Sequence, residues 1–248
     1  MNYMEYGKTH TEVIVLLHGG GLSWWNYREA AEKLSSDYHV ILPILDGHAK
    51  SSCDFTSIEE NAARIIAFID RQFGGSVLLI GGLSLGGQVA LEMLSQKKDI
   101  CRYALIESAL VVPSKFTYAM IKPAFGSCYG LIKHRWFSKL QFKSLKIKQE
   151  LFEDYFRDTC GISKSNMIAF LEANALYGIK PSVADCSTKS YVFVGEKENK
   201  AMQKSAKIIA DALLDGTLQV LPDMHHGEFS INHADSYAST VRKIVQKK

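Results

Sequence analysis

What this sequence of 248 residues lacks excludes several classes of protein. No segment approaches a charge-free apolar run long enough to cross a bilayer. The first ten residues, MNYMEYGKTH, do not show the basic and then apolar pattern of a secretory signal. We therefore expect no integral membrane segment and a cytoplasmic protein.

Cysteine is sparse and its spacing carries no metal or disulfide signature. The five cysteines are scattered, odd in number and contain no C-x-x-C pair. This distribution predicts reduced thiols, and it argues against a disulfide framework and against a zinc site.

The chain also lacks the usual marks of a nucleic-acid or nucleotide partner. Its net charge is only +3, too small to favour nucleic acid. Neither G-x-G-x-x-G nor the P-loop pattern occurs, so no motif indicates nucleotide binding. With 47% apolar and 22% charged residues and no internal repeat, the composition is that of a globular protein with one large core.

Short apolar segments alternate with amphipathic ones through most of the chain. Alternation of this kind predicts an α/β fold with a mostly parallel sheet covered by helices on both faces. Ser57 and Glu60 have the spacing of a capping box at the start of one helix. Buried strands are expected at residues 12–19, 38–45, 76–82, 102–108, 190–196 and 217–223.

This alternation stops between residues 109 and 187, which contain many aromatic residues and no clear strand. A helical insertion of this size in an α/β chain is typical of a cap or lid. We therefore expect an α/β core formed by residues 1–108 and 188–248, with a helical cap at 109–187.

The stretch GLSLG places Ser84 between two apolar segments and between two glycines. Gly and Ser are common turn residues, so the match alone is weak. The pattern is also that of a nucleophile elbow, in which a tight strand-to-helix turn exposes the serine oxygen. The rest of the sequence has to decide between these interpretations.

A serine nucleophile requires a base, an acid and backbone donors for the oxyanion. The base is expected in LPDMHHGEFSINH, after the last predicted strand, where His226 precedes a glycine and is preferred over His225. His233 is expected inside the final helix. These three histidines have no carboxylate or cysteine at ligand spacing, so we expect no metal site.

Two glutamates compete for the role of the acid. Glu198 follows the strand SYVFVGE, and Glu107 ends the strand RYALIES. Both lie where parallel strands reach the carboxyl edge of the sheet. The chain order Ser84, Glu198, His226 is the serine, acid, histidine order of one hydrolase fold, which favours Glu198.

The oxyanion donors are expected from LLHGGG, whose glycines allow N–H groups to turn toward an anion. The N–H groups of Gly20 and of Leu85, the residue after the nucleophile, would form the oxyanion hole.

Over nearly its full length the chain resembles α/β-hydrolase fold serine hydrolases that have a helical cap. The segments that carry the resemblance are LLHGGG, LPILDGHAKS, GLSLGG, VGEKE and HHGEF. The resemblance implies Ser84 as nucleophile, His226 as base, Glu198 as acid, and Gly20 with Leu85 as oxyanion donors.

The chain departs from the family pattern at three positions. Ile44 and Ala49 stand where the family commonly has Asp and Gly, in a loop that is mainly structural. Glu198 stands where Asp is commoner, so Glu107 remains an alternative. Because the expected nucleophile is Ser84, the resemblance is to ester-cleaving members and not to haloalkane dehalogenases, whose nucleophile is an aspartate.

The predicted reaction is hydrolysis of a carboxylic ester with a small or medium apolar acyl group, through an acyl-enzyme and without a cofactor. Trp24, Trp25, Trp136 and the aromatic residues of the cap are candidates for an acyl pocket. The alternatives are thioester, amide or carbon–carbon bond hydrolysis, and a ligand-binding signalling protein that retains the triad.

The first part of the expected cap is basic. Between Glu107 and Glu150 there is no Asp or Glu, yet eight Lys or Arg residues occur there among seven aromatic ones. One interpretation is a lid whose basic residues face water while its aromatic residues pack over the core. The other is peripheral contact with an anionic amphiphile, such as a negatively charged lipid surface.

Overall fold

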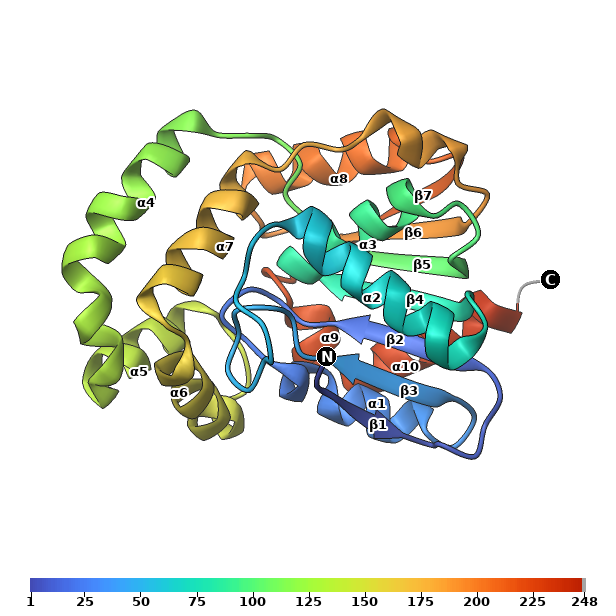
Figure 1. Ribbon diagram of the computed structural model, residues 1–248, viewed down its shortest axis with the longest axis horizontal. Helices are drawn as coiled ribbons and strands as arrows, with labels where there is room; N and C mark the ends of the chain where they lie inside the picture. The colour runs from blue at the N-terminus through green and yellow to red at the C-terminus, as the bar shows by residue number, and fades with distance from the viewer. Residues whose placement is uncertain (247–248) are drawn as a thin grey trace.

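The computed structural model describes residues 1–246 and has a central seven-stranded sheet (Figure 1). The strand order is β1-β3-β2-β4-β5-β6-β7, and all neighbours are parallel except β1 and β3. The predicted α/β fold with a mostly parallel sheet is confirmed. The strands are β1 (Tyr3–Tyr6), β2 (Val13–Leu17), β3 (His39–Pro43), β4 (Val77–Leu83), β5 (Cys101–Glu107), β6 (Lys189–Gly195) and β7 (Asp215–Leu221).

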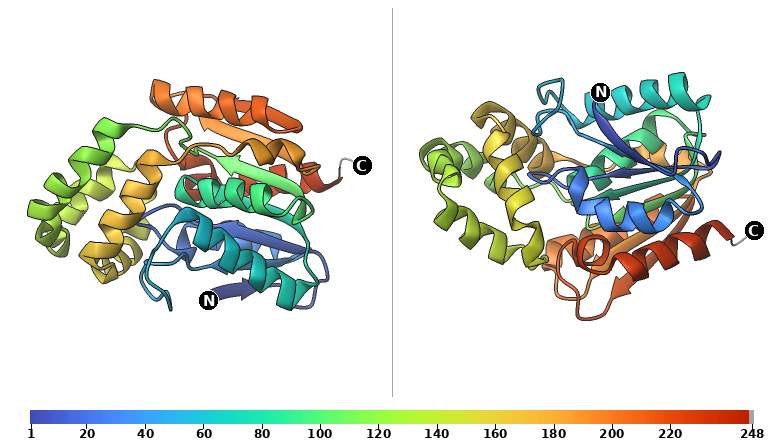
Figure 2. Two further views of the ribbon diagram at one scale, coloured as in Figure 1. Left: turned by 45° about the horizontal axis from the view of Figure 1, so that its top comes forward. Right: turned by 90° about the horizontal axis from the view of Figure 1, so that it is seen from below.

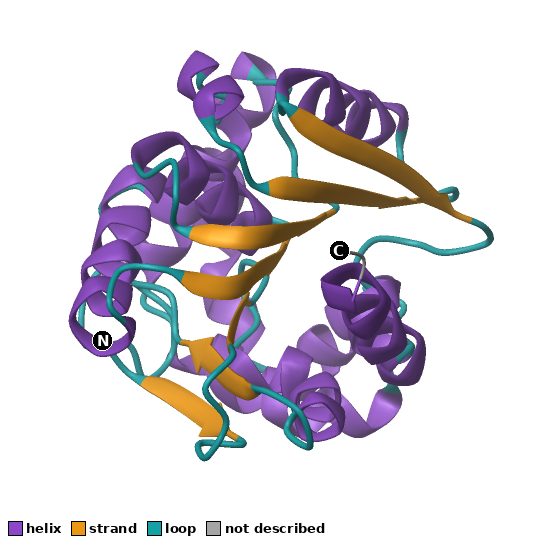
Figure 3. Ribbon diagram, turned by 90° about the vertical axis from the view of Figure 1, so that its right-hand side faces the viewer, coloured by secondary structure: helices purple, strands orange, loops and turns teal. Residues whose placement is uncertain are grey.

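Helices cover both faces of the sheet (Figure 3). One face packs against α2 (Ile58–Phe73), α3 (Leu85–Gln96) and α8 (Lys200–Ala212). The other packs against α1 (Arg28–Leu34), α9 (Glu228–Asn232) and α10 (Ala234–Gln246). Of the capping box predicted at the start of α2, the Ser57 bond is confirmed: Ser57 Oγ accepts a hydrogen bond of 3.0 Å from the N–H of Glu60.

Strand β2 shows how the sequence fills both hydrophobic cores. Its five residues are all buried, and successive side chains of a strand point to opposite faces. Val13, Val15 and Leu17 therefore join the core beneath α2, α3 and α8. Ile14 and Leu16 join the core beneath α1 and α10. A continuous apolar segment is required at such a strand because neither face meets water.

The segment between β5 and β6 is helical and lies beyond one end of the sheet (Figures 1 and 2). Among the described residues it contains no strand. Its α-helices are α4 (Lys115–Cys128), α5 (Arg135–Ser144), α6 (Phe152–Gly161) and α7 (Lys164–Leu176). Short 3-10 helices occur here at η2 (Tyr129–Lys133), η3 (Gln149–Leu151) and η4 (Pro181–Asp185), and before α1 at η1 (Trp24–Tyr27).

Three local features differ from the sequence prediction. Strand β1 was not expected; it is four residues long, largely exposed, and pairs only along the edge at β3, so it lacks a buried apolar pattern. The strand expected at 217–223 begins two residues earlier, at Asp215. His233 lies between α9 and α10, not inside the last helix.

No helix within residues 1–246 is long and apolar enough to cross a membrane.

Candidate active site

Ser84 lies on the sharp turn between β4 and α3, and its backbone is strained. Its φ of 54° and ψ of −113° are unusual for a residue with a side chain. Such conformations cost about 1–3 kcal/mol and persist only when the surroundings fix them. Here the Ser84 N–H donates to the carbonyl of Glu107 at 2.8 Å, and the Ser84 carbonyl accepts from the Gln88 N–H at 3.0 Å.

The glycines on either side of Ser84 are required by close backbone contacts. A Cβ on Gly82 would lie 2.2 Å from the carbonyl oxygen of Gly86. A Cβ on Gly86 would lie 2.1 Å from the carbonyl oxygen of Leu17, in strand β2. Both distances are shorter than any van der Waals contact, so the G-x-S-x-G pattern here is a packing requirement of the turn.

His226 pairs with Glu198, and the pair comes from two loops at the carboxyl edge of the sheet. His226 Nδ1 lies 2.7 Å from Glu198 Oε2. A carboxylate can only accept, so this nitrogen carries the proton and Nε2 remains free to accept one. Glu198 Oε1 accepts a hydrogen bond of 2.7 Å from Ser108 Oγ and one of 2.8 Å from the Gly195 N–H.

Glu198 is held in its charged form although its side chain is only 2% exposed. Burial by itself would raise the pKa of this carboxyl. The hydrogen bonds and the charge of His226, with the bonds from Ser108 and Gly195, outweigh burial and bring the pKa below its ordinary value. Glu198 can therefore orient the imidazole of His226 and stabilise its protonated form.

The two alternatives to these residues make other contacts. His225 binds Glu228, with its Nδ1 3.1 Å and its backbone N–H 2.5 Å from Glu228 Oε2. Glu107 is 1% exposed and its Oε1 accepts a bond of 3.3 Å from the backbone N–H of Ser230, in α9. Its Oε2 has no hydrogen-bond partner among residues 1–246. The contacts therefore favour His226 and Glu198.

Burial raises the pKa of Glu107 to about 7, against the opposing effects of Ser230 and His226. The folded state then holds more protons than the unfolded chain between about pH 4.5 and pH 7, so this group makes the protein less stable as the pH rises through that window.

Glu107→Gln removes that titration. We expect the variant to gain stability relative to the wild type as pH rises from 4.5 to 7, by up to about 3 kcal/mol. Urea unfolding of both proteins at several pH values measures this difference. A difference that stays constant with pH would contradict a raised pKa at Glu107.

Gly20 and Leu85, the expected oxyanion donors, are neighbours. A Cβ on Gly20 would lie 3.5 Å from Leu85 Cβ. Leu85 is the first residue of α3, where an N–H has no partner within the helix. The Gly20 N–H donates no hydrogen bond within residues 1–246. Both groups are thus free to donate to an oxyanion, and the start of α3 adds the positive end of a helix dipole.

Two buried histidines fix the loop that carries Gly20. His18 Nε2 accepts from the Leu45 N–H and His48 Nε2 accepts from the Gly21 N–H, both at 3.1 Å. Burial lowers the pKa of His18 to about 3 and that of His48 to about 4. Both rings are therefore neutral at neutral pH, as an accepting nitrogen requires.

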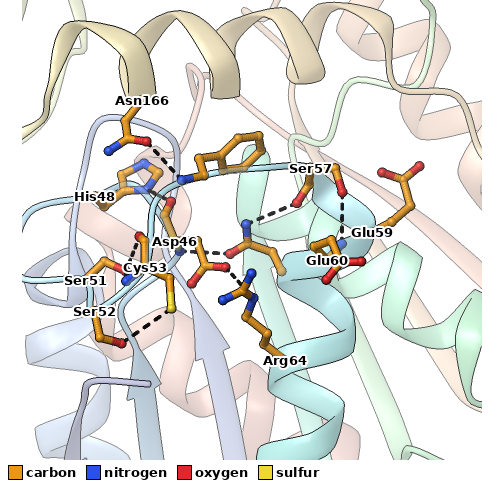
Figure 4. Close-up of polar contacts among 12 residues, drawn as sticks. Asp46, His48, Ser51, Ser52, Cys53, Ser57, Glu59, Glu60, Arg64 and Asn166 are labelled. Atoms are coloured by element: carbon orange, nitrogen blue, oxygen red, sulfur yellow. Dashed lines mark hydrogen bonds and ion pairs between the residues drawn. The ribbon is translucent and has the colours of Figure 1, made fainter.

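Figure 4 shows the loop from which His48 extends. His48 Nδ1 lies 3.1 Å from the carbonyl of Asp46, and Arg64 Nε forms an ion pair with Asp46 Oδ2 at 3.1 Å without hydrogen-bond geometry. Asn166, from α7, accepts a hydrogen bond of 3.0 Å from the Phe55 N–H. These contacts connect the loop to α2 and α7, and so hold His48 beneath the glycine loop.

Ser84 and His226 line one cavity of about 330 Å³ between the sheet edge and the helices that follow β5. Gly20 and Gly21 line it from the glycine loop. Most other lining residues are apolar, and within the described chain none of them is Asp, Glu, Lys or Arg. They include Leu22, Phe125, Ile132, Leu145, Ile147, Met167, Phe170, Leu171 and Ile231.

Comparison with known proteins assigns the family. The model of the alpha/beta hydrolase family matches residues 14–240. The chain belongs to the alpha/beta hydrolase family.

One protein similar in sequence to this alpha/beta hydrolase is a lipase, and solved structures of similar fold include an esterase and an enol-lactonase. It is 31% identical over 114 residues to Lipase 1 of Psychrobacter immobilis, across 44% of this chain and 35% of the lipase. Among solved structures, a thermophilic esterase from Thermogutta terrifontis has a TM-score of 0.81 and 16% identity, covering 99% of this chain and 93% of the esterase. The enol-lactonase from Burkholderia xenovorans has a TM-score of 0.81 and 15% identity, over 99% and 96% of the two chains.

The sequence prediction of the acyl pocket of this hydrolase was wrong for the tryptophans. Trp25 is buried, and its Nε1 donates to Asp158 at 3.0 Å. Trp24 stacks under Arg28, and Trp136 is 64% exposed. None of the three lines the cavity, whereas Phe125, Phe170 and Tyr155 do.

Three supporting residues of this hydrolase were not singled out from the sequence. Ser108 donates to Glu198, and His18 and His48 hold the glycine loop. All three directly follow or adjoin residues that were selected, in RYALIES, LLHGGG and LDGHAKS. Position directly after a strand was thus an available signal for His18 and Ser108, whereas His48 lies in the loop beyond β3. No cluster of three or more potential metal ligands occurs within residues 1–246.

Proposed function

We propose that this alpha/beta hydrolase is a serine hydrolase that cleaves carboxylic esters with a neutral, apolar acyl group. The observation that supports this most is the arrangement of the cavity. A serine on a strained turn, a histidine paired with a buried carboxylate, and the glycine loop line one apolar cavity. The N–H groups of Gly20, in that loop, and of Leu85, next to the serine, have no hydrogen-bond partner within residues 1–246. Acyl transfer requires a nucleophile, a base with its orienting acid, and oxyanion donors.

The proposed reaction proceeds through an acyl-enzyme. His226 Nε2 takes the proton of Ser84 as Ser84 Oγ attacks the ester carbonyl, and the N–H groups of Gly20 and Leu85 donate to the oxyanion. His226 then protonates the leaving alcohol. In the second half, His226 activates a water that attacks the acyl carbon, and the acid is released with Ser84 restored. The negative charge of Glu198 stabilises the imidazolium in both halves.

We further propose that residues 109–187 form a cap over a core made of residues 1–108 and 188–248. Phe125 of α4, Gln141 and Ser144 of α5, Thr159 of α6 and Phe170 of α7 line the cavity from this segment. The cap would thus supply most of the acyl-binding surface, while the core supplies the reacting groups. Because the lining within the described chain carries no fixed charge, a charged acyl group would be desolvated there without a partner.

The test is turnover of p-nitrophenyl esters of increasing acyl length. The cavity holds roughly ten non-hydrogen atoms at about 30 Å³ each, so kcat/KM should rise by up to about fourfold for each added methylene and then level off or fall. Sustained multiple turnover distinguishes a hydrolase from a ligand-binding protein that retains the triad. A single stoichiometric burst, or no hydrolysis by a folded protein, would contradict the proposal.

The role of the acid is tested by a matched pair of variants. Glu198→Gln removes the charge that stabilises the imidazolium, and we expect kcat to fall by about 10³- to 10⁴-fold. Glu107→Gln should retain activity near that of the wild type, because Glu107 contacts α9 and not His226. Steady-state kinetics of both purified variants give the ranking. The reverse ranking would assign the acid to Glu107.

A further inference from the structure

Helix α4 exposes an unusual amount of apolar surface. Of its 14 residues only Ile121 is buried. Phe116 is 78% exposed and Met120 is 49% exposed, and these residues lie one helical turn apart on the same side. Exposed apolar surface on a helix of this kind is typical of a protein–protein or membrane interaction site.

Helix α5 continues this pattern. Trp136 and Leu140 are each 64% exposed and are also one turn apart. Lys139 and Lys143 follow Trp136 by three and seven residues, so they lie on the same side of the helix. The inward side of α5 is different, because Phe142 and Ser138 are buried there. The sequence alone allowed all these aromatic residues to pack over the core, and for Phe116 and Trp136 that interpretation is wrong.

The chain segment that carries these apolar side chains has charges of one sign, although the exposed Glu153 of α6 pairs with Arg135 beside Trp136. Residues 108–149 contain no Asp or Glu, and contain seven Lys and one Arg. Three of the eight have acidic partners elsewhere in the chain: Lys122 with Glu172, Arg135 with Glu153 and Lys148 with Glu29. The other five form no ion pair within residues 1–246; they are Lys115, Lys133, Lys139, Lys143 and Lys146.

We propose that this surface docks the protein on an anionic lipid membrane. The α4–α5 face is defined here by two exposed groups: Phe116 and Met120 with Lys115 on α4, and Trp136 and Leu140 with Lys139 and Lys143 on α5. Exposed Trp, Phe and Leu beside Lys is the composition of segments that lie in a membrane interface, where the apolar groups enter the headgroup boundary and the cations meet anionic lipid.

The chemistry of the face favours lipid over other partners. A symmetric dimer through this face would bring two basic surfaces together, which is repulsive. The aliphatic Met120 and Leu140 cannot stack on bases as aromatic platforms in single-strand binding do.

Docking by this face would bring the cavity to the membrane. Figures 1 and 2 show α4 and α5 at the outer end of the molecule, beyond the sheet. The same two helices line the cavity from their other sides, with Phe125 from α4 and Gln141 and Ser144 from α5. The membrane-facing surface and the acyl-binding surface are thus two sides of one pair of helices. The inference does not rest on the proposed reaction, because docking requires no turnover.

The experiment is co-sedimentation of the full chain with vesicles of phosphatidylcholine, alone or with part of it replaced by phosphatidylglycerol. We expect binding to the anionic vesicles at about 10 mM salt, weaker binding at about 150 mM, and little binding to neutral vesicles. The Debye length falls from about 30 Å to about 8 Å between these salts. Trp136 fluorescence should shift to the blue on binding, and Trp136→Phe should abolish that shift.

Two double variants of equal net charge distinguish an effect of the α4–α5 face from an effect of the protein's total charge. Lys115→Glu with Lys143→Glu should weaken binding to anionic vesicles by at least about tenfold. Lys204→Glu with Lys207→Glu, two exposed lysines of α8, should bind as the wild type does. Hydrolysis of a short soluble ester, or the unfolding transition if no hydrolysis is found, checks that both variants are folded.

Several results would overturn the proposal. These are equal binding to both vesicle types, no binding at low salt, or equal losses in the two charge variants. A dimer in solution that Trp136→Ser dissociates would assign the face to a second copy of this chain. Equally tight binding of a single-stranded oligonucleotide, lost in Lys115→Glu with Lys143→Glu, would assign it to nucleic acid.

Discussion

Ser84→Ala is expected to remove ester turnover almost completely, by about 10⁶-fold in kcat at the upper end for such nucleophiles. The variant loses the only atom proposed to bond to the acyl carbon, while the turn itself is held by backbone hydrogen bonds and flanking glycines that remain. The melting temperature should therefore change little. Initial rates with a short p-nitrophenyl ester and a thermal scan measure both quantities.

Ser108→Ala is the matched control for this variant. Ser108 also follows a strand and also has a positive φ, of 53°, but it donates to Glu198 and does not line the cavity. Losing a hydrogen bond to a charged group costs about 1.5–3 kcal/mol. We therefore expect the kcat of Ser108→Ala to fall by about ten- to a hundredfold. Substantial turnover by a folded Ser84→Ala protein would exclude Ser84 as the nucleophile.

Replacing His226, one of the adjacent pair His225 and His226, is expected to give the second large loss of kcat. His226→Ala should lower kcat by about as much as Ser84→Ala, because a nucleophile and its base act as a unit. The double variant should be no worse than either single one, and this non-additivity is itself measurable in kcat.

His225→Ala controls for disturbance of the loop. His225 binds Glu228 within its own loop and does not line the cavity. We expect its removal to affect stability more than kcat. If His225→Ala is the inactive variant and His226→Ala is not, the base has been assigned to the wrong member of the pair.

Most strands of the sheet were predictable because a strand that is buried on both faces has a recognisable apolar sequence. Strands β2 and β4 are buried along their whole length, so the sequence there is a continuous run of apolar and glycine residues. Strand β1 carries no such signal, since its stability comes from pairing with β3 and its side chains stay largely exposed. Residues Tyr3–Tyr6 form a strand only because they pair with β3.

The choice between Glu198 and Glu107 shows where sequence reasoning about the site stops. Both residues lie at the carboxyl ends of neighbouring strands, and sequence order alone cannot say which carboxyl faces the histidine. The fold separates them through neighbours distant in the chain: Glu198 meets His226 and Ser108, and Glu107 meets Ser230. The prediction that the tryptophans line the acyl pocket was wrong for a similar reason. Side-chain type does not determine which side of a helix faces a cavity.

The most direct test of Ser84 as an activated nucleophile is covalent labelling with a fluorophosphonate probe, followed by mass spectrometry of the peptides. The phosphorus reagent reacts with a serine only where a base removes its proton and donors stabilise the oxyanion. We predict one adduct per chain, on Ser84, absent from Ser84→Ala and greatly slowed in His226→Ala. An adduct on another residue, or a folded protein that the probe leaves unlabelled, would contradict the account.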